Sequence, residues 1–333
     1  GNNTLIAGNT FEGIADTAIY VGTNVSGTTI YANTFRDVGE LDYGSALYCQ
    51  TSSNTKVVYN DVYGAGQYAF SFKGAGTGHT AFTCSNNFIT RTNRRAYDTG
   101  AIEFLNRSDL DLNATVSGNY ISDAGGFGVN TSGTILDPYR ASCIYLDDLS
   151  SNVTITKNFL RGATWGQVFI HGGDDNLIEN NFHIIQPQDL YVSTMHANGN
   201  LTGNVNPERN TFQKNIYYST TARTGTLWNV GGLGTGNVID YNTYFNLPLL
   251  SGYDANSQIA DPLFADFGAD NFALQGTSPV FAKGVVNLEW TRMGPYGYTQ
   301  AAATAETLPR FWSSWAGAPF IDLNYQAHFA LYG

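Results

Sequence analysis

Short stretches of alternating apolar and polar residues recur along the chain, and each of them ends at an asparagine. The first four stretches, "IAGN", "IYAN", "VVYN" and "CSNN", end at Asn9, Asn33, Asn60 and Asn87. The later ones end at Asn119, Asn158, Asn181, Asn215 and Asn242. Because the alternation breaks after a few residues at Gly, Asn or Asp, the pattern predicts strands and turns rather than helices.

The spacing of these asparagines, between 23 and 39 residues, indicates one repeated unit with insertions. A single unit cannot bury its own apolar side chains, whereas units stacked at ~4.8 Å share a continuous core. The predicted fold is all-β, a right-handed parallel β-helix of about nine coils over residues 1–260, with a C-terminal cap over residues 261–333. Each ladder asparagine is expected to adopt the left-handed conformation at a bend and to hydrogen-bond its copy in the next coil.

A further strand follows the asparagine in six coils and shares one pattern of alternation. Its second and fourth residues are apolar and should face inward, so its third and fifth residues should face outward. In this register Asp147 and His171 become neighbours on adjacent coils, and Glu103 lies diagonal to Asp147. The six predicted strands cover residues 18–22, 46–50, 69–73, 101–105, 143–147 and 167–171.

Composition narrows the classes of partner. The net charge of −11 and pI near 4.7 would repel a phosphate backbone, so no nucleic acid is expected. No apolar run approaches the ~18 residues that cross a bilayer, so no membrane segment is expected either. Cys49 and Cys143 lie three coils apart, ~14 Å of stacking, which is too far for a disulfide. We interpret them and Cys84 as small core or near-core residues.

The outward column carries the residue types that glycosidic-bond hydrolysis needs, a carboxylic acid to protonate the leaving oxygen and a second carboxylate. One coil rise with a two-residue offset puts Glu103 and Asp147 roughly 8 Å apart, which is compatible with an inverting arrangement. Asp98 lies at the bend before the Glu103 strand, and Asp148 follows Asp147. The predicted catalytic residues are Asp98, Glu103, Asp147, Asp148 and His171.

The longest coil has an insertion between Asn119 and Cys143, and insertions of this kind often form the wall of a binding site. Aromatic side chains at outward positions would stack on sugar rings, and a lysine could neutralise an acidic sugar. The predicted substrate-binding residues are Tyr48, Lys73, Tyr145, Trp165 and Phe169. No metal ligands or cofactors are assigned. Asp174 and Asp175 are interpreted as a turn, with calcium binding as the alternative interpretation.

Three motifs resemble those of right-handed β-helix carbohydrate-active proteins of the pectin-lyase-like superfamily, especially glycoside hydrolase family 141. They are "DTGAIEF" at 98–104, "CIYLDDLSS" at 143–151 and "IHGGDDN" at 170–176. The resemblance covers roughly residues 1–297 and implies that Asp98 and Asp147 take part in catalysis. Glu103 departs from the family, which often has Tyr there. The chain also has the "DD" of family-28 polygalacturonases and an "HGG" where they carry "GHG", but it lacks their "NTD" and "RIK" motifs.

The function expected from the sequence is that of a secreted, extracellular glycoside hydrolase acting on a neutral or lightly charged plant or algal polysaccharide. A non-catalytic glycan-binding or fibre-forming β-helix protein is the alternative. A polygalacturonase-like hydrolase or a polysaccharide lyase or epimerase is the second alternative. The sequence begins inside a coil, so further residues upstream or another subunit are expected to cover the first coil. N-x-S/T sequons such as Asn106 and Asn152 are compatible with a glycoprotein.

Overall fold

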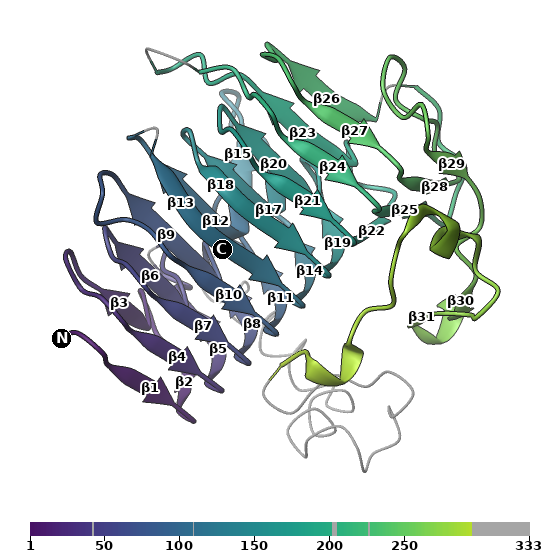
Figure 1. Ribbon diagram of the computed structural model, residues 1–333. Helices are drawn as coiled ribbons and strands as arrows, with labels where there is room; N and C mark the ends of the chain where they lie inside the picture. The colour runs from purple at the N-terminus through teal and green to yellow at the C-terminus, as the bar shows by residue number, and fades with distance from the viewer. Residues whose placement is uncertain (42, 109, 202–204, 226, 295–333) are drawn as a thin grey trace.

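The chain folds into a right-handed parallel β-helix in which each complete coil contributes one strand to each of three long sheets (Figure 1). The computed structural model describes residues 1–41, 43–108, 110–201, 205–225 and 227–294. Nearly all of its regular structure is strand, which confirms the all-β prediction. Among the described residues, no helix has the length and apolar character needed to cross a bilayer.

Sheet A contains the strands that precede the nine ladder asparagines, so the predicted number of coils is confirmed. Its strands are β1 (Leu5–Ala7), β4 (Thr29–Tyr31), β7 (Lys56–Val58), β10 (Thr83–Ser85), β13 (Asp111–Ser117), β18 (Ser151–Thr156), β21 (Leu177–Glu179), β24 (Thr211–Gln213) and β27 (Val238–Asp240).

Sheet B, which the sequence pattern did not predict, begins directly after the asparagines. Its strands are β2 (Thr10–Glu12), β5 (Thr34–Val38), β8 (Asp61–Ala65), β11 (Phe88–Thr92), β14 (Tyr120–Ala124), β19 (Phe159–Ala163), β22 (Phe182–Ile185), β25 (Ile216–Ser219), β28 (Thr243–Phe245) and β29 (Gln258–Ile259).

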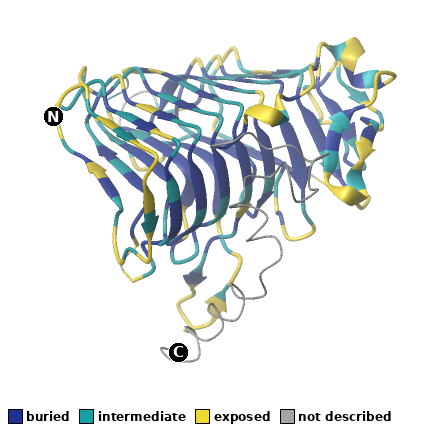
Figure 2. Ribbon diagram, turned by 90° about the horizontal axis from the view of Figure 1, so that it is seen from below, coloured by how far each residue is buried: buried dark blue, intermediate teal, exposed yellow. Residues whose placement is uncertain are grey.

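Sheet C contains the six further strands that the sequence predicted and two more. Its strands are β3 (Ile19–Val21), β6 (Leu47–Gln50), β9 (Phe70–Gly74), β12 (Thr99–Asn106), β17 (Ala141–Asp147), β20 (Val168–His171), β23 (Ser193–His196) and β26 (Trp228–Gly231). The predicted register is confirmed, since Leu105 pairs with Asp147 and Tyr145 with Phe169. The inward residues of the three sheets form one buried core, drawn in dark blue in Figure 2, and the three free cysteines are buried.

The corner between sheets A and B is the most regular part of the coil, because two residues separate the strands in every coil. The second of these is the asparagine, and its side chain bonds the next one in an unbroken ladder from Asn9 to Asn242. The expectation that the asparagine itself is left-handed is wrong. The residue before it, such as Ala32 (φ 51°) or Lys157 (φ 56°), makes the bend. The asparagine therefore keeps its amide aligned with the stack.

The insertion of the longest coil lies between sheets B and C and forms a short antiparallel hairpin. Strand β15 (Gly128–Val129) pairs with β16 (Ile135–Leu136), and the chain then returns to β17. The hairpin is tied to the preceding coil, because the backbone N–H of Phe127 donates to the carbonyl of Ala96 (2.8 Å). The insertion is thus anchored beside the amino end of β12.

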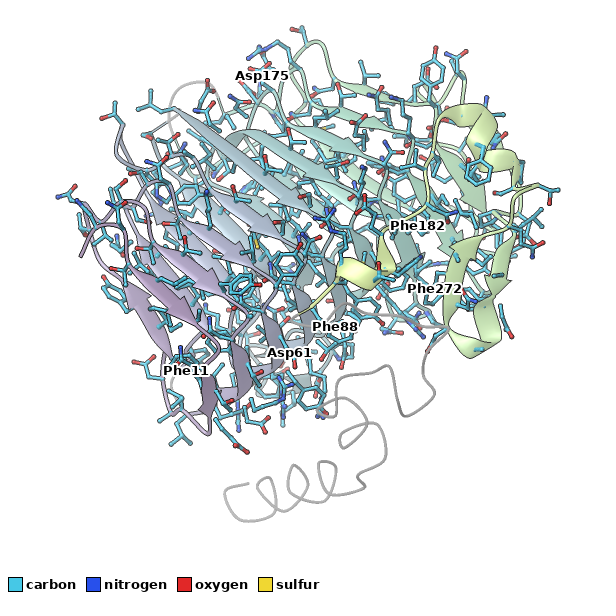
Figure 3. All side chains as sticks on the ribbon, turned by 60° about the horizontal axis from the view of Figure 1, so that its bottom comes forward. Phe11, Asp61, Phe88, Asp175, Phe182 and Phe272 are labelled. Atoms are coloured by element: carbon cyan, nitrogen blue, oxygen red, sulfur yellow. The ribbon has the colours of Figure 1, made fainter. Side chains whose placement is uncertain are left out.

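After β29 the chain turns back and covers the outer face of sheet B (Figure 1). This segment contains η1 (Phe267–Ala269), η2 (Pro279–Lys283) and η3 (Trp290–Arg292), with β30 (Phe264–Asp266) and β31 (Asn271–Leu274) paired in a hairpin. Its apolar residues, such as Phe272, pack on outward aromatics of sheet B, such as Phe88 and Phe182; all three are labelled in Figure 3. The segment "TAETLPRFWSSW", for which a short helix was expected, lies outside the described residues.

Candidate functional site on sheet C

Two outward side chains of adjacent coils meet at the carboxyl end of the sheet C strands. Asp147 ends β17 and His171 ends β20, and Nδ1 of His171 lies 2.9 Å from Oδ1 of Asp147. Each side chain is 18% exposed, so both can be reached from solvent. The predicted neighbourhood of Asp147 and His171 is therefore confirmed, and the pair lies on one surface of the coil.

The hydroxyl of Tyr145 joins this pair to a second carboxylate. It donates to Oδ1 of Asp98 at 3.4 Å and lies 3.4 Å from Nδ1 of His171. Asp98 stands at the bend before β12 with a left-handed backbone (φ 55°), and its N–H donates to the carbonyl of Arg140 (2.8 Å). Asp98, Tyr145, Asp147 and His171 thus come together from three coils, and we call them the polar cluster.

The surroundings of Asp98 make its carboxyl a weaker acid than a free aspartate. Burial of its carboxyl raises the pKa of Asp98, and the negative charge of Asp147 raises it further. Burial also raises the pKa of Tyr145 well above its usual range, with Asp147 and Asp98 adding to the effect. The phenol therefore keeps its proton and acts as a hydrogen-bond donor. Two neighbouring carboxyls in different surroundings are the arrangement that acid and base roles require.

Glu103 does not share the outer surface with these residues, although it occupies the predicted outward position on β12. Its side chain is 1% exposed and its Oε1 lies 2.7 Å from Nζ of Lys73. The N–H of Gly100 donates to the other carboxylate oxygen (3.3 Å), and Nζ of Lys73 also donates to the hydroxyl of Tyr68 (2.6 Å). The expectation of a solvent-facing Glu103 is wrong, because Lys73 and the neighbouring backbone enclose its carboxylate.

The Glu103 carboxylate is buried, and the pKa of Glu103 and the pKa of Lys73 each depend on the charge of the other residue. Burial raises the pKa of Glu103 to about 7, opposed by Lys73 and assisted by Asp147. Burial lowers the pKa of Lys73, but the charges of Glu103 and Tyr68 and the hydrogen bonds to them together outweigh this effect, and the net pKa of Lys73 is raised. Lys73 therefore neutralises a carboxylate of this chain, in place of the substrate carboxylate that the sequence suggested.

The aromatic residues predicted to stack on sugar rings are placed differently from one another. Tyr145 and Phe169 are 2% and 8% exposed and stack on each other, with ring centroids 4.5 Å apart. Their faces are therefore covered, and the prediction that they are exposed is wrong. Tyr48 is half-buried and lies several coils away from Tyr145 and Phe169. Its ring stacks on that of Tyr20 in the adjacent coil (5.8 Å). Trp165 is half-buried before β20, and its ring contacts Tyr191 (5.3 Å).

Asp148, the second residue of the "DD" pair, is engaged by the protein itself. Nε of Arg107 lies 2.6 Å from its Oδ2, and the amide of Asn198 donates to its Oδ1 (2.5 Å). Its own N–H donates to Oδ1 of Asp147 at 2.9 Å. Asp148 is thus a buried residue that helps to position Asp147, and neither Arg107 nor Asn198 was identified from the sequence.

A cation fits poorly between Asp147, Asp148 and His171, although their ligand atoms lie within 4.8 Å of one another. Both oxygens of Asp148 already accept hydrogen bonds, and the Arg107 guanidinium beside it would repel a cation. Calcium moreover prefers about 6–8 oxygen ligands. At the predicted turn, Arg209 pairs with both Asp174 and Asp175 (3.3 and 2.8 Å), which opposes calcium binding there too.

Comparison with known proteins supports the fold. A family described as "Right handed beta helix region" matches residues 1–137. No curated protein matches the sequence. Among solved structures, the A-module of the mannuronan C-5 epimerase AlgE6 from Azotobacter vinelandii has a TM-score of 0.41 and 11% identity, covering 78% of this chain and 82% of that one.

Two further solved structures are similar at a lower level. A PL6 alginate lyase in complex with a trisaccharide has a TM-score of 0.33 and 8% identity, covering 78% of each chain. The A-module of the epimerase AlgE4 from Azotobacter vinelandii has a TM-score of 0.30 and 11% identity, covering 78% of this chain and 81% of that one. At these values no residue role is transferred to the present chain.

Proposed function

We propose that this protein is a polysaccharide-active enzyme, specifically a glycoside hydrolase whose acid and base are Asp98 and Asp147. The observation that carries the proposal is the meeting of two unlike carboxyls around the Tyr145 hydroxyl, one with a raised pKa and the other hydrogen-bonded to His171. Both are accessible on the outer face of sheet C. Glu103 is left out of the acid–base pair because it is buried.

In this proposal each residue has one role. Asp98 protonates the glycosidic oxygen of the leaving sugar, while Asp147 either activates a water molecule or attacks the anomeric carbon. His171 donates to Oδ1 of Asp147 and holds that carboxylate in position. Tyr145 donates to Oδ1 of Asp98, which leaves the other oxygen of that carboxyl to carry the transferred proton. The N–H of Asp148 donates to the same oxygen of Asp147 as His171 does and helps to fix it.

The substrate class and location proposed are those suggested by the motifs, a plant or algal polysaccharide outside the cell. A β-helix presents a long face of stacked strands, which suits an extended polymer better than a small molecule. Polymers of this size are degraded outside the cell because they do not cross its membrane. Secretion is part of the proposal for that reason.

A second candidate function is favoured by the contact between Tyr145 and His171. A phenol 3.4 Å from an imidazole could act with it as an acid and base pair that removes a proton next to a sugar carboxylate, as a lyase or epimerase requires. A lyase would release an unsaturated sugar that absorbs in the ultraviolet, whereas a hydrolase would release a reducing end without that absorbance. The two activities are therefore separated by one assay.

The proposal is tested by incubating the purified chain with a panel of plant and algal polysaccharides and measuring reducing ends and ultraviolet absorbance. Asp147→Asn should lower kcat by roughly 10³-fold while polymer binding is retained, because a positioned acid or base contributes about 10²–10⁴-fold. Asp16→Asn, an exposed carboxylate of the first coil, is the matched control and should keep full activity.

Two results would count against the proposed hydrolase. Absence of turnover by the unaltered chain on every polymer, together with binding, would favour the glycan-binding alternative. Turnover that Asp147→Asn leaves intact would contradict the proposed roles.

A further inference from the structure

Aromatic side chains and one arginine line the amino ends of four successive sheet C strands, beside the polar cluster. Each residue lies one to three positions before its strand, and consecutive coils are separated by ~4.8 Å. The residues are Tyr97 before β12, Tyr139 and Arg140 before β17, Trp165 before β20 and Tyr191 before β23. We call them the aromatic edge.

The members of the aromatic edge contact one another from coil to coil. The rings of Tyr97 and Tyr139 lie 5.4 Å apart, and the guanidinium of Arg140 lies 4.7 Å from the ring centre of Trp165. Trp165 in turn meets Tyr191 edge to face at 5.3 Å. The N–H of Trp165 donates to the carbonyl of Ala141 (2.9 Å), so the backbone fixes this spacing. The edge is a continuous row and not a set of scattered aromatics.

Arg140 differs from seven other arginines of the described chain in having no carboxylate partner. Arg36, Arg94, Arg95, Arg107, Arg161, Arg209 and Arg292 each pair with a carboxylate. Arg140 is exposed, lies over the rings of Tyr139 and Trp165, and forms no ion pair among the described residues. In a chain of net charge −11, an arginine that is held by aromatic rings but not by a carboxylate has its charge available to a ligand.

The stacked position of Arg140 determines what it can bind. A guanidinium lying over aromatic faces keeps its N–H groups free along its edge, and that edge matches the two oxygens of a carboxylate or sulfate. The neighbouring rings supply flat apolar surface for the sugar that carries the anion. Arg140 is also adjacent to the polar cluster, because its carbonyl accepts from the N–H of Asp98 (2.8 Å).

We infer that Arg140, stacked between Tyr139 and Trp165, binds the carboxylate or sulfate of an acidic sugar in the polymer next to the polar cluster. The inference rests on the proposed function and makes it narrower, since it selects an anionic polysaccharide rather than a neutral one. The protein's negative charge elsewhere repels such a polymer. Binding of an anionic polymer therefore depends on the aromatic edge. The position of the Arg140 charge determines that an acidic sugar is preferred to a neutral one.

The test measures binding and not turnover, so it succeeds or fails independently of the hydrolase proposal. Affinity electrophoresis in gels containing a polyuronate, a sulfated galactan or a neutral xylan gives a dissociation constant for each polymer. We expect at least one anionic polymer to bind more tightly than xylan, and the polymer that binds identifies carboxylate or sulfate as the ligand. Arg140→Gln should weaken that binding about tenfold, the range expected for hydrogen bonds to a charged group.

Two companion variants make the result specific. Lys56→Gln removes one positive charge from the exposed face of sheet A and should leave binding within about twofold. Arg140→Lys keeps the charge but loses the planar fork, so it should bind between the parent and Arg140→Gln. Equal binding of xylan and the anionic polymers, binding of none of them, or an unchanged affinity in a folded Arg140→Gln or Arg140→Lys variant would overturn the inference. Binding that depends on Arg140 without turnover would uphold it and count against the hydrolase.

Discussion

Two stacks of polar side chains run along the same solenoid and differ in almost every respect. The ladder at the corner of sheets A and B repeats one residue type nine times, and its inner members, such as Asn60 and Asn119, are fully buried. The outward column of sheet C instead reads Gln50, Lys73, Leu105, Asp147, His171 and His196. Repetition of one residue marks a structural role, and loss of repetition marks the place where chemistry can occur.

The difference has a physical origin. In the ladder each amide bonds the backbone or side chain of its neighbour, so every donor is used within the stack. In the column, unlike side chains meet, and part of the hydrogen-bonding capacity of Asp147 and His171 is open to solvent. The side-chain amides of the ladder therefore have no donor left to bind a ligand. The column near β17 and β20 has open groups and lies beside Asp98, whose pKa is raised by burial and by the charge of Asp147.

The largest expected effect is on the ladder. Asn119→Leu removes the acceptor of two bonds from Asn87 and the donor to the carbonyl of Cys84. Because each buried unpaired group costs about 1–3 kcal/mol, we expect the free energy of unfolding to fall by roughly 3–5 kcal/mol, measured by urea denaturation. Asn200→Leu makes the same chemical change at an exposed position and should alter it by less than about 0.5 kcal/mol. Equal losses in both variants would contradict the structural role of the ladder.

A smaller effect is expected at the ion pair that Lys73, a member of the column, forms with the buried Glu103. Lys73→Met leaves the Glu103 carboxylate without its cation and should lower the free energy of unfolding by about 2 kcal/mol at neutral to alkaline pH. Adding Glu103→Gln should restore much of this loss, because the double variant has no unpaired charge.

The pH dependence of this variant has a definite sign. The pKa of Glu103 is raised from 4.5 to about 7 in the folded chain, so folding is favoured by the protonated form. The stability contributed by this proton is full below about pH 4.5 and is lost as pH rises towards 7. Removing Lys73 raises the folded pKa further, so the difference from the parent should grow with pH. A loss that is largest in acid would contradict this account.

The smallest expected effect sharpens the assignment of Asp98. Its hydrogen bond from Tyr145 lowers the pKa of Asp98 against the larger raising effects of burial and Asp147. Activity should be lost as pH rises through the pKa of Asp98, since only the protonated carboxyl can donate. Tyr145→Phe removes the lowering contribution, so the alkaline limb of kcat/KM should move to higher pH, with a fall in kcat of about tenfold.

Tyr48→Phe serves as the control for this pH profile. Tyr48 lies three coils before Tyr145, at the same position of its sheet C strand. It makes no hydrogen bond to Asp98. Its pH profile should match that of the parent. A shift of the alkaline limb to lower pH in Tyr145→Phe would rule out Asp98 as the proton donor.

The sequence was sufficient for the coils and for the contact between Asp147 and His171, because both follow from a strict strand period and a visible repeat. Sheet B was missed because its strands begin directly after the asparagine, without a separate turn signal. The burial of Glu103, Tyr145 and Phe169 was also missed. An alternating pattern tells which side of a strand a residue faces, but not which neighbours cover that side.

The contacts of Arg107 and Arg140 could not be predicted from an alternating pattern either. Arg107 reaches Asp148 from the preceding coil, and Arg140 is placed by the return of the insertion to β17. Both contacts depend on the path of a loop, which no period describes. The motif "CIYLDD" marked the strand that ends at the polar cluster, yet it did not separate the partly exposed Asp147 from the buried Asp148.

The constant corner between sheets A and B has a consequence for how such a protein can diverge. Two residues join these sheets in every coil, so variation in coil length falls in the strands and at the other two corners. A lineage can therefore lengthen or shorten those loops without disturbing the asparagines that align the stack. Recombining loops from relatives at the B–C corner, where β15 and β16 lie, would thus be a practical route to altered polymer selectivity on an unchanged frame.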